Sequence, residues 1–367
     1  MSDVKFKLAA GTNVGLIRQN NEDNFVVCSD LTTSDWMIPQ TSEYTELGEY
    51  GALLVVADGM GGANAGEVAS AIAVETIQNL FIPEQLETAV ASDKSIQEFM
   101  KDVVKNADLN ILHRSQEDSS TLGMGTTVVM AWLLNDKAYV CWCGDSRCYV
   151  LNKQHGLIQL SKDHSYVQEL VDKGELNPEL MHDHPLSNVI TRCLGDMENR
   201  ANPETRVYQL HNGDTIMLCS DGLSSLCNDH EILDRMIEFR EDPKECKNEL
   251  ISAALNNGGY DNVTIALCNI EMEEDEEPQA EEETQLPEDT KEESDDAESD
   301  QDTETISSTV RSEDIRPKRK YKWLVFLLLL LIAAGVYVYF SKECEPVRNA
   351  IVGAYNDMIS YIKNLKG

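Results

Sequence analysis

This 367-residue chain has an apolar segment near its C-terminus, and a long acidic stretch precedes it. Together they limit a globular domain to the residues before the acidic stretch. Residues 323–340 read WLVFLLLLLIAAGVYVYF. As a helix they would span roughly 27 Å, enough for the hydrocarbon core of a membrane. Aromatic residues stand near both ends, where amphipathic rings favour the interface. We therefore expect a single transmembrane helix over 323–340. The alternative, a buried core helix, fits poorly after a disordered acidic segment.

The flanking residues predict a linker, an orientation and a tail. Residues 271–316 nearly lack large apolar side chains, so they cannot bury enough surface to offset their ordering entropy and should form a disordered linker. The basic residues directly before the span are Arg316, Lys318, Arg319, Lys320 and Lys322. Fewer follow it, so the positive-inside rule places the N-terminal region in the cytoplasm and the protein in the cell membrane. Residues 341–367 have the apolar spacing of an amphipathic extracytoplasmic helix. This tail could lie on the membrane, pair with a second copy, or have no function of its own.

Composition excludes some partners and suggests a compartment. The chain holds 65 Asp and Glu against 30 Lys and Arg, a formal net charge of -35. A nucleic-acid partner is therefore not expected, because phosphate backbones attract the opposite charge. The ten cysteines form no zinc-like pairs. Those in apolar runs (Cys141, Cys143, Cys219 and Cys268) should be free thiols in a reducing compartment.

Residues 1–270 have the patterns of a globular domain. Apolar or β-branched runs predict strands over 52–57, 127–134, 137–143, 215–219 and 263–270. Amphipathic patterns predict helices over roughly 64–80, 93–115, 229–239 and 243–256. Several of the strands are apolar on both faces, which indicates a sheet covered on each side. Two packed sheets with helices outside would satisfy this pattern.

Four aspartates stand next to predicted strands, beside glycine or another turn residue: Asp58, Asp145, Asp221 and Asp261. Strand ends can converge on one edge, where gathered carboxylates repel one another unless cations neutralise them. Ligation by oxygen alone favours Mg²⁺ or Mn²⁺ over zinc. Taken singly, each aspartate is better explained as a turn residue or cap, so the inference depends on the whole set.

Short motifs in a fixed order complete that set. They are 18–24 (RQNNEDN), 57–62 (ADGMGG), 123–127 (GMGTT), 144–147 (GDSR), 163–165 (DHS), 184–185 (HP), 190–192 (ITR), 220–223 (SDGL) and 261–264 (DNVT). Together they resemble the metal-dependent protein serine/threonine phosphatases (type 2C, or PPM) in their bacterial form. The resemblance covers about residues 5–270 and does not include the linker, span or tail.

The resemblance implies a fold and a set of site residues. The fold would be of the α+β class, a four-layer α-β-β-α sandwich of two antiparallel sheets flanked by helices. Two Mn²⁺ or Mg²⁺ ions would be bridged by Asp58, with the Gly59 carbonyl on one ion and Asp221 and Asp261 on the other. A water or hydroxide shared by the ions would attack phosphorus in line, with no phosphoenzyme.

Further roles follow from the same resemblance. Glu22 and Asp23 would orient metal-bound waters, and Arg18 would bind the substrate phosphate. Residues 165–190 would form a flap beside the site. The run 163–165 would be structural rather than a Ser-His-Asp triad, because adjacent residues rarely face one another.

Two positions depart from the family pattern. Met60 stands where eukaryotic members carry a histidine proposed as general acid, so the leaving group must be protonated by water or another side chain. Ser225 stands where the family often supplies an acid that helps bind a third metal with the residue equivalent to Asp145. Asp145 therefore remains a candidate ligand for a third metal ion, but we expect that site to be weak.

The resulting hypothesis is a membrane-anchored phosphatase that removes phosphate from Ser or Thr of cytoplasmic proteins. The resemblance to the family implies that it would oppose a Ser/Thr kinase. Membrane lipid would surround its anchor. A catalytically weak phosphatase-like scaffold is an alternative, although the core acids are all present. Another is a dedicated switch phosphatase acting on one regulatory partner. A third takes the acidic linker itself as the functional element.

Overall fold

A computed structural model describes residues 4–34, 36, 43–61, 65–182 and 184–272. The predicted span 323–340, the tail 341–367 and all but the first two residues of the predicted linker lie outside these residues. Within them, no helix is both long and apolar enough to cross a membrane.

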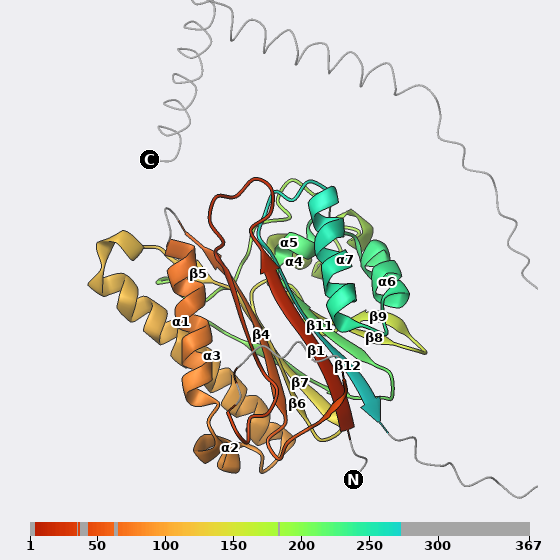
Figure 1. The fold of residues 1–367 in the computed structure, drawn as a ribbon. Coiled ribbons are helices and arrows are strands. Elements are labelled where there is room, and N and C mark those ends of the chain that lie inside the picture. The colour runs from red at the N-terminus through yellow and green to blue at the C-terminus, as the bar shows by residue number, and fades with distance from the viewer. Residues whose placement is uncertain (1–3, 35, 37–42, 62–64, 183, 273–367) are drawn as a thin grey trace, which may run out of the picture. The chain divides into compact units, whose positions relative to one another are not determined.

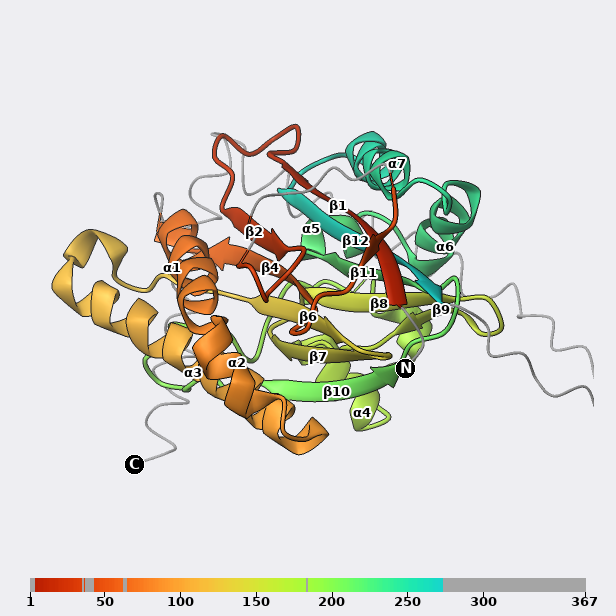
Figure 2. The same cartoon turned by 60° about the horizontal axis from the view of Figure 1, so that its bottom comes forward.

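Two antiparallel sheets form the centre of the described domain (Figures 1 and 2). The first has the order β3-β1-β12-β11-β8-β9, and the second has the order β10-β7-β6-β4-β2 with β5 paired to β4. Strands of the first sheet are β1 (Val4–Asn13), β3 (Thr45–Glu46), β8 (Arg147–Asn152), β9 (Gly156–Gln159), β11 (Thr215–Cys219) and β12 (Val263–Met272). Strands of the second are β2 (Asp23–Cys28), β4 (Ala52–Met60), β5 (Gly125–Thr126), β6 (Val128–Leu134), β7 (Lys137–Cys143) and β10 (Glu204–Gln209).

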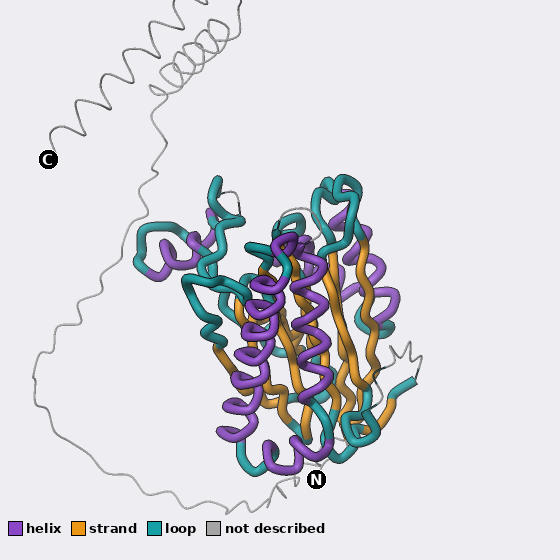
Figure 3. Tube along the Cα trace, turned by 90° about the vertical axis from the view of Figure 1, so that its left-hand side faces the viewer, coloured by secondary structure: helices purple, strands orange, loops and turns teal. Residues whose placement is uncertain are grey.

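Helices cover the outer face of each sheet. Figure 1 shows α1–α3 on one side and α6 and α7 on the other, and Figure 3 shows the first group in front of the strands. The bounds are α1 (Ala65–Leu80), α2 (Pro83–Ala89), α3 (Asp93–Glu117), α4 (Tyr166–Asp172), α5 (Asp221–Ser224), α6 (Asp229–Glu238) and α7 (Pro243–Asn256). Three apolar clusters fill the spaces between the layers. The predicted α-β-β-α arrangement of two antiparallel sheets is confirmed.

Strand β6 shows why the central strands are apolar on both faces. Alternate side chains point to opposite faces of a sheet. Accordingly, Val128, Met130 and Trp132 belong to the cluster beneath the α1–α3 layer, whereas Val129 and Ala131 belong to the cluster between the sheets. Both faces are buried, so the sequence has no polar alternation.

All the strands and helices predicted within residues 1–270 are present, with ends shifted by a few residues at most. Strand β12 continues to Met272, two residues beyond the predicted end of the domain, because Glu271 and Met272 pair with Lys5 and Val4. The four cysteines expected in strands are buried, and no disulfide forms among the described cysteines.

Trp132 is a suitable test of the core beneath the α1–α3 layer. Its side chain is 0% exposed, contacts Phe81 edge-on at 5.2 Å between ring centroids, and donates to the Tyr50 carbonyl at 2.8 Å. We expect Trp132→Ala to lower the free energy of unfolding by about 3–5 kcal/mol, measured by urea denaturation. Leu109→Ala is the control, since Leu109 is 50% exposed on α3, and it should change stability by about 0.5 kcal/mol or less. Equal losses in the two variants would contradict this description of the core.

Candidate functional site

The predicted site residues come together at one end of the sandwich. A pocket of about 300 Å³ is lined by Arg18, Glu22, Asp58, Gly59, Met60, Gly61, Thr127, Asp145, Asn188, Ile190, Asp221 and Asp261. We call it the acidic pocket. It contains all the predicted site residues except Asp23, which is buried and pairs with Asp58 across strands β2 and β4. The structure therefore gathers residues that are separated by more than 200 positions in the chain.

Backbone hydrogen bonds fix Asp58 at the end of β4. Its N–H donates to Thr127 Oγ1 at 3.1 Å, and its carbonyl accepts from Thr127 N at 2.8 Å and Thr126 Oγ1 at 2.9 Å. Thr127 Oγ1 also lies 2.7 Å from Ser146 Oγ, next to Asp145. These contacts couple the loop that carries Asp145 to the strand that carries Asp58.

Gly59 lies where the chain passes between two other segments. A Cβ atom at this position would overlap the carbonyl oxygens of Gly66 and Glu22. The Gly59 N–H donates to the Glu22 carbonyl at 3.2 Å. Only glycine allows this close approach, which brings the β4 backbone, the start of α1 and the loop before β2 together at the pocket.

Asp23 joins the two sheets beneath the acidic pocket. Its carboxylate accepts from Ser220 Oγ at 2.8 Å and from Thr264 Oγ1 at 2.6 Å, both residues of the other sheet or its edge. Burial raises its pKa to about 7, against the lowering effect of these two hydrogen bonds. Asp23 is therefore partly protonated near neutral pH when no cation offsets the local charge.

The other carboxyl groups of the pocket are also difficult to ionise. Burial and then the charge of Asp23 and its other acidic neighbours raise the pKa of Asp58 well above its ordinary value. Burial raises the pKa of Asp221 and Asp145, and a side-chain hydrogen bond links Asp58 to Asp221. Each of these three groups retains part of its solvent access, so water and ions can reach them. The site is a concentration of negative charge that favours cations.

Arg18 and Asp261 form the exposed side of the pocket. Arg18 Nη2 lies 2.8 Å from Asp261 Oδ2, with side chains that are 49% and 25% exposed. This hydrogen bond raises the pKa of Arg18. Because a guanidinium carries five N–H donors, Arg18 keeps donors for an anion while it is paired with Asp261.

Asn262 is a site-building residue that sequence reasoning did not single out. Its Nδ2 donates to the carbonyls of Val14 and Asn20 at 2.9 and 3.0 Å. Its Oδ1 accepts from Glu22 N at 2.7 Å. One side chain thus shapes the β1–β2 loop that presents Arg18 and Glu22. Its place in the 261–264 motif was the only available signal.

The residues of the 163–165 run have separate structural contacts. Asp163 accepts from Arg147 Nε and Nη2 at 3.0 and 2.7 Å. His164 Nδ1 accepts from Gly144 N at 3.1 Å. Ser165 caps α4 by accepting from Gln168 N. The expectation that these residues do not form a Ser-His-Asp triad is confirmed.

The pocket offers the donors that a hard divalent cation requires. Glu22, Asp58, Asp145, Asp221 and Asp261 present carboxylate oxygens to one space, and Mg²⁺ and Mn²⁺ favour such ligands. Across the described ranges, no three Asp, Glu, His or Cys side chains are grouped closely enough to hold a metal by themselves. Mg²⁺ usually retains several waters and uses only one or two carboxylates, so the arrangement still fits cations bound partly through water.

Comparison with known proteins identifies relatives of this chain. Residues 43–257 match the family model described as protein phosphatase 2C. The serine/threonine phosphatase stp of Listeria monocytogenes serotype 4b (strain F2365) is 31% identical over 263 residues, covering 72% of this chain and 95% of that protein. Protein phosphatase PhpP of Streptococcus pneumoniae serotype 2 is 34% identical over 225 residues, covering 61% and 88%.

A solved structure extends the comparison to metal binding. It contains the catalytic domain of the serine/threonine protein phosphatase PstP in complex with 2 manganese ions. Its TM-score is 0.58 at 29% identity, and the match covers 73% of this chain and 99% of that one.

The burial of Asp23, with repulsion from Asp221 and Asp261 as a smaller cause, predicts how stability depends on pH. The folded chain binds Asp23's proton with a pKa of about 7 against an ordinary value of 3.8. This group therefore favours folding below about pH 4, and its contribution is lost as the pH rises through 7. In chelator, we expect Asp58→Asn to raise the melting temperature at pH 7.5 by about 2–6 °C, because it removes one of the repelling carboxylates.

Scanning calorimetry with chelator and then with excess Mn²⁺ provides the measurement. Mn²⁺ should stabilise the unsubstituted chain more than Asp58→Asn. Asp234→Asn, an exposed position on α6, is the control and should leave both melting temperatures unchanged. If Asp58→Asn lowered the metal-free melting temperature, repulsion would not be the main effect of the Asp58 carboxyl group on stability.

Proposed function

Since the chain belongs to the protein phosphatase 2C family, we propose that the acidic pocket is the active site at which this serine/threonine phosphatase hydrolyses its substrates. The observation that carries the proposal is the convergence of the predicted acids and Arg18 on one pocket. Proteins phosphorylated on Ser or Thr are the substrates. A scaffold without activity would have no need for so many partly buried, mutually repelling carboxyl groups, since they cost stability.

The enzyme is metal-dependent, and the acidic pocket contains the residues that would hold the cations. We assign two Mn²⁺ or Mg²⁺ ions to Asp58, the Gly59 carbonyl, Asp221 and Asp261, with Glu22 and Asp23 orienting bound waters. When bound, the cations lower the pKa of a water molecule and neutralise charge on the phosphoryl group. Ser225 offers a hydroxyl instead of a carboxylate beside Asp145 and Asp221, so no third ion is included.

Arg18 is the residue we assign to the phosphate. Its guanidinium is half exposed at the mouth of the pocket and is positioned by Asp261. A planar fork of donors matches phosphate oxygens. By orienting the phosphoryl group, Arg18 would contribute to in-line geometry. Met60, which also lines the pocket, cannot donate a proton, so the leaving group would take its proton from water or from another side chain.

We also propose that the enzyme is anchored in the cell membrane by 323–340, with its catalytic domain in the cytoplasm. The support is the apolar run itself and the basic residues directly before it. The residues 273–316 would then tether the domain to the bilayer, and membrane lipid would contact the anchor. A Ser/Thr kinase that phosphorylates the same substrates would be its functional counterpart.

Metal dependence tests the active site directly. The full-length chain, purified in detergent, should release phosphate from p-nitrophenyl phosphate and a phosphothreonine peptide with Mn²⁺ or Mg²⁺ and lose this activity in chelator. We expect Asp58→Asn and Asp221→Asn to lower kcat by about 10²–10³-fold, since each removes charge that positions the cations. Asp234→Asn should retain activity. Activity that survives chelation, or that persists in Asp58→Asn, would refute this assignment.

Protease accessibility tests the orientation. In intact cells, an added protease should leave the N-terminal domain uncut, as detected by an antibody against that domain. After the cells are opened, the same protease should cleave it. Deletion of 323–340 should move the domain from the membrane to the soluble fraction. Digestion of the domain in intact cells would reverse the proposed topology.

A further inference from the structure

A second pocket opens beside the active site. It has a volume of about 560 Å³ and shares Asp145, Asn188 and Asp221 with the acidic pocket. We call it the flanking pocket. A substrate residue next to the phosphorylated one would therefore reach it while the phosphate occupies the acidic pocket. Nothing in the proposed hydrolysis uses the rest of its lining.

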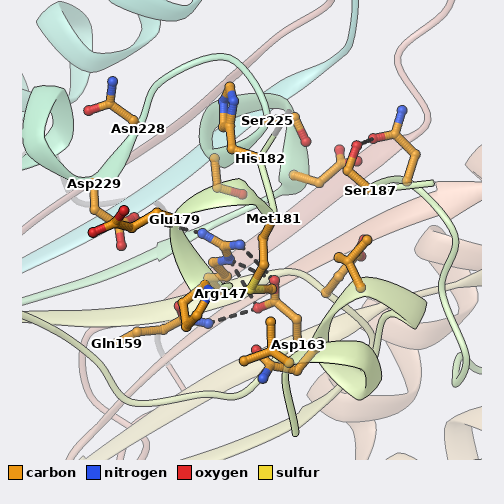
Figure 4. Close-up of a pocket in the computed structure, with 18 of the residues that line it drawn as sticks. Arg147, Gln159, Asp163, Glu179, Met181, His182, Ser187, Ser225, Asn228 and Asp229 are labelled. Atoms are coloured by element: carbon orange, nitrogen blue, oxygen red, sulfur yellow. Dashed lines mark hydrogen bonds and ion pairs between the residues drawn. The ribbon is translucent and has the colours of Figure 1, made fainter. Parts of the chain in front are cut away.

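Most of the lining of the flanking pocket comes from three parts of the fold, and α5 and Tyr260 complete it. Residues from α4 and the segment after it form one wall, including Val167, Val171 and Met181. Residues near β8 and β9 contribute Arg147 and Asp163, and the start of α6 contributes Asp229. Figure 4 shows Glu179 and Asp229 on one side of the pocket, beside Arg147, and Ser187 on the other. The lining thus combines an apolar wall with an acidic side.

The charge of this pocket is negative even without the shared active-site residues. Arg147 is its one guanidinium, and Asp163 engages it through two nitrogens at 3.0 and 2.7 Å. Asp229 lies farther from Arg147 Nη1, at 3.7 Å, and its side chain is 64% exposed. Among the described residues, no ion pair engages Glu179. Asp229 also accepts a hydrogen bond from the Tyr149 hydroxyl at 3.0 Å. One guanidinium therefore faces the carboxylates of Asp163, Glu179 and Asp229, so a net negative charge remains in this part of the pocket.

We propose that the flanking pocket selects substrates with an Arg or Lys close to the phosphorylated residue. The aliphatic stem of such a side chain would lie along Val167, Val171 and Met181, and its charged head would contact Glu179 and Asp229. Long basic side chains bury their stems while the head stays in a polar, charged environment. An acidic residue at the same place would be repelled. This inference rests on the proposed function, because it names the substrates of that active site.

A peptide series on the full-length enzyme tests the proposal. Each peptide carries one phosphothreonine and a single Arg at one of the three positions on either side, with Gln and Glu in place of Arg as comparisons. We expect kcat/KM for Arg to exceed that for Gln by about threefold to tenfold at one or more positions, with Glu below Gln. The preference should shrink when salt is raised from about 50 mM to about 0.5 M.

Charge-neutralising variants connect this preference to the pocket. In Glu179→Gln combined with Asp229→Asn, the ratio of kcat/KM for Arg over Gln should fall toward one. Each ratio is measured on one preparation, so a change in the active fraction cancels. The matched control is Glu175→Gln with Asp234→Asn, which removes the same charge from exposed positions outside the pocket and should keep the ratio.

The outcomes separate this inference from the proposed function. An enzyme that is active on p-nitrophenyl phosphate and on the peptides but shows no preference for Arg contradicts the flanking-pocket proposal alone. The same conclusion follows if the pocket variant keeps the preference, or if the control variant loses it equally. An enzyme without metal-dependent activity on any substrate contradicts the proposed function, and this inference with it.

Discussion

The Asp23 carboxylate connects the two sheets at the end that carries the active site. It accepts hydrogen bonds from Ser220 and Thr264 on one sheet while its own strand pairs with the strand of Asp58 in the other. A buried acid is costly unless its hydrogen bonds are satisfied, and here both donors come from the opposite sheet. The spacing of the acids in the pocket therefore depends on how the sheets are joined, and the same contact that builds the site also concentrates its negative charge.

Much of the fold could be predicted because the central strands are buried on both faces. The apolar run of β6 shows no polar alternation, so a strand buried on both faces is its most direct interpretation. Strand β10 was missed because it lies at an edge, and its residues ETRVYQ remain partly exposed, with no apolar run to mark it. Strands β1, β2, β8 and β9 were also missed, although the alternation in VKFKL of β1 is a strand signal.

Most residues of the site could also be predicted, because their types and positions are visible in the sequence. Acids at strand ends beside turn residues are visible in a sequence, and the ordered motifs placed Arg18 and Glu22 with them. The hydrogen bonds that hold these residues were not predictable. Asn262 contacts Glu22 across 240 positions of sequence, and Asp23 contacts Thr264 across 241. Such contacts depend on which strands become neighbours, and local patterns contain no information on that choice.

The segment between β9 and β10 leaves and re-enters the domain at almost the same point. The Thr191 N–H donates to the His164 carbonyl at 2.8 Å, and the Tyr166 N–H donates to the Val189 carbonyl at 2.8 Å, while Ser165 and Ile190 form a β-bridge. Residues 164–166 and 189–191 are therefore joined by their own backbone hydrogen bonds. Because these bonds close the base of the loop, the residues beyond them contribute little to holding the two sheets together. Lengthening such a loop has a small entropic cost, about 0.6 kcal/mol for each doubling. The wall of the flanking pocket can therefore diverge during evolution, or be grafted from a relative, without redesign of the catalytic core.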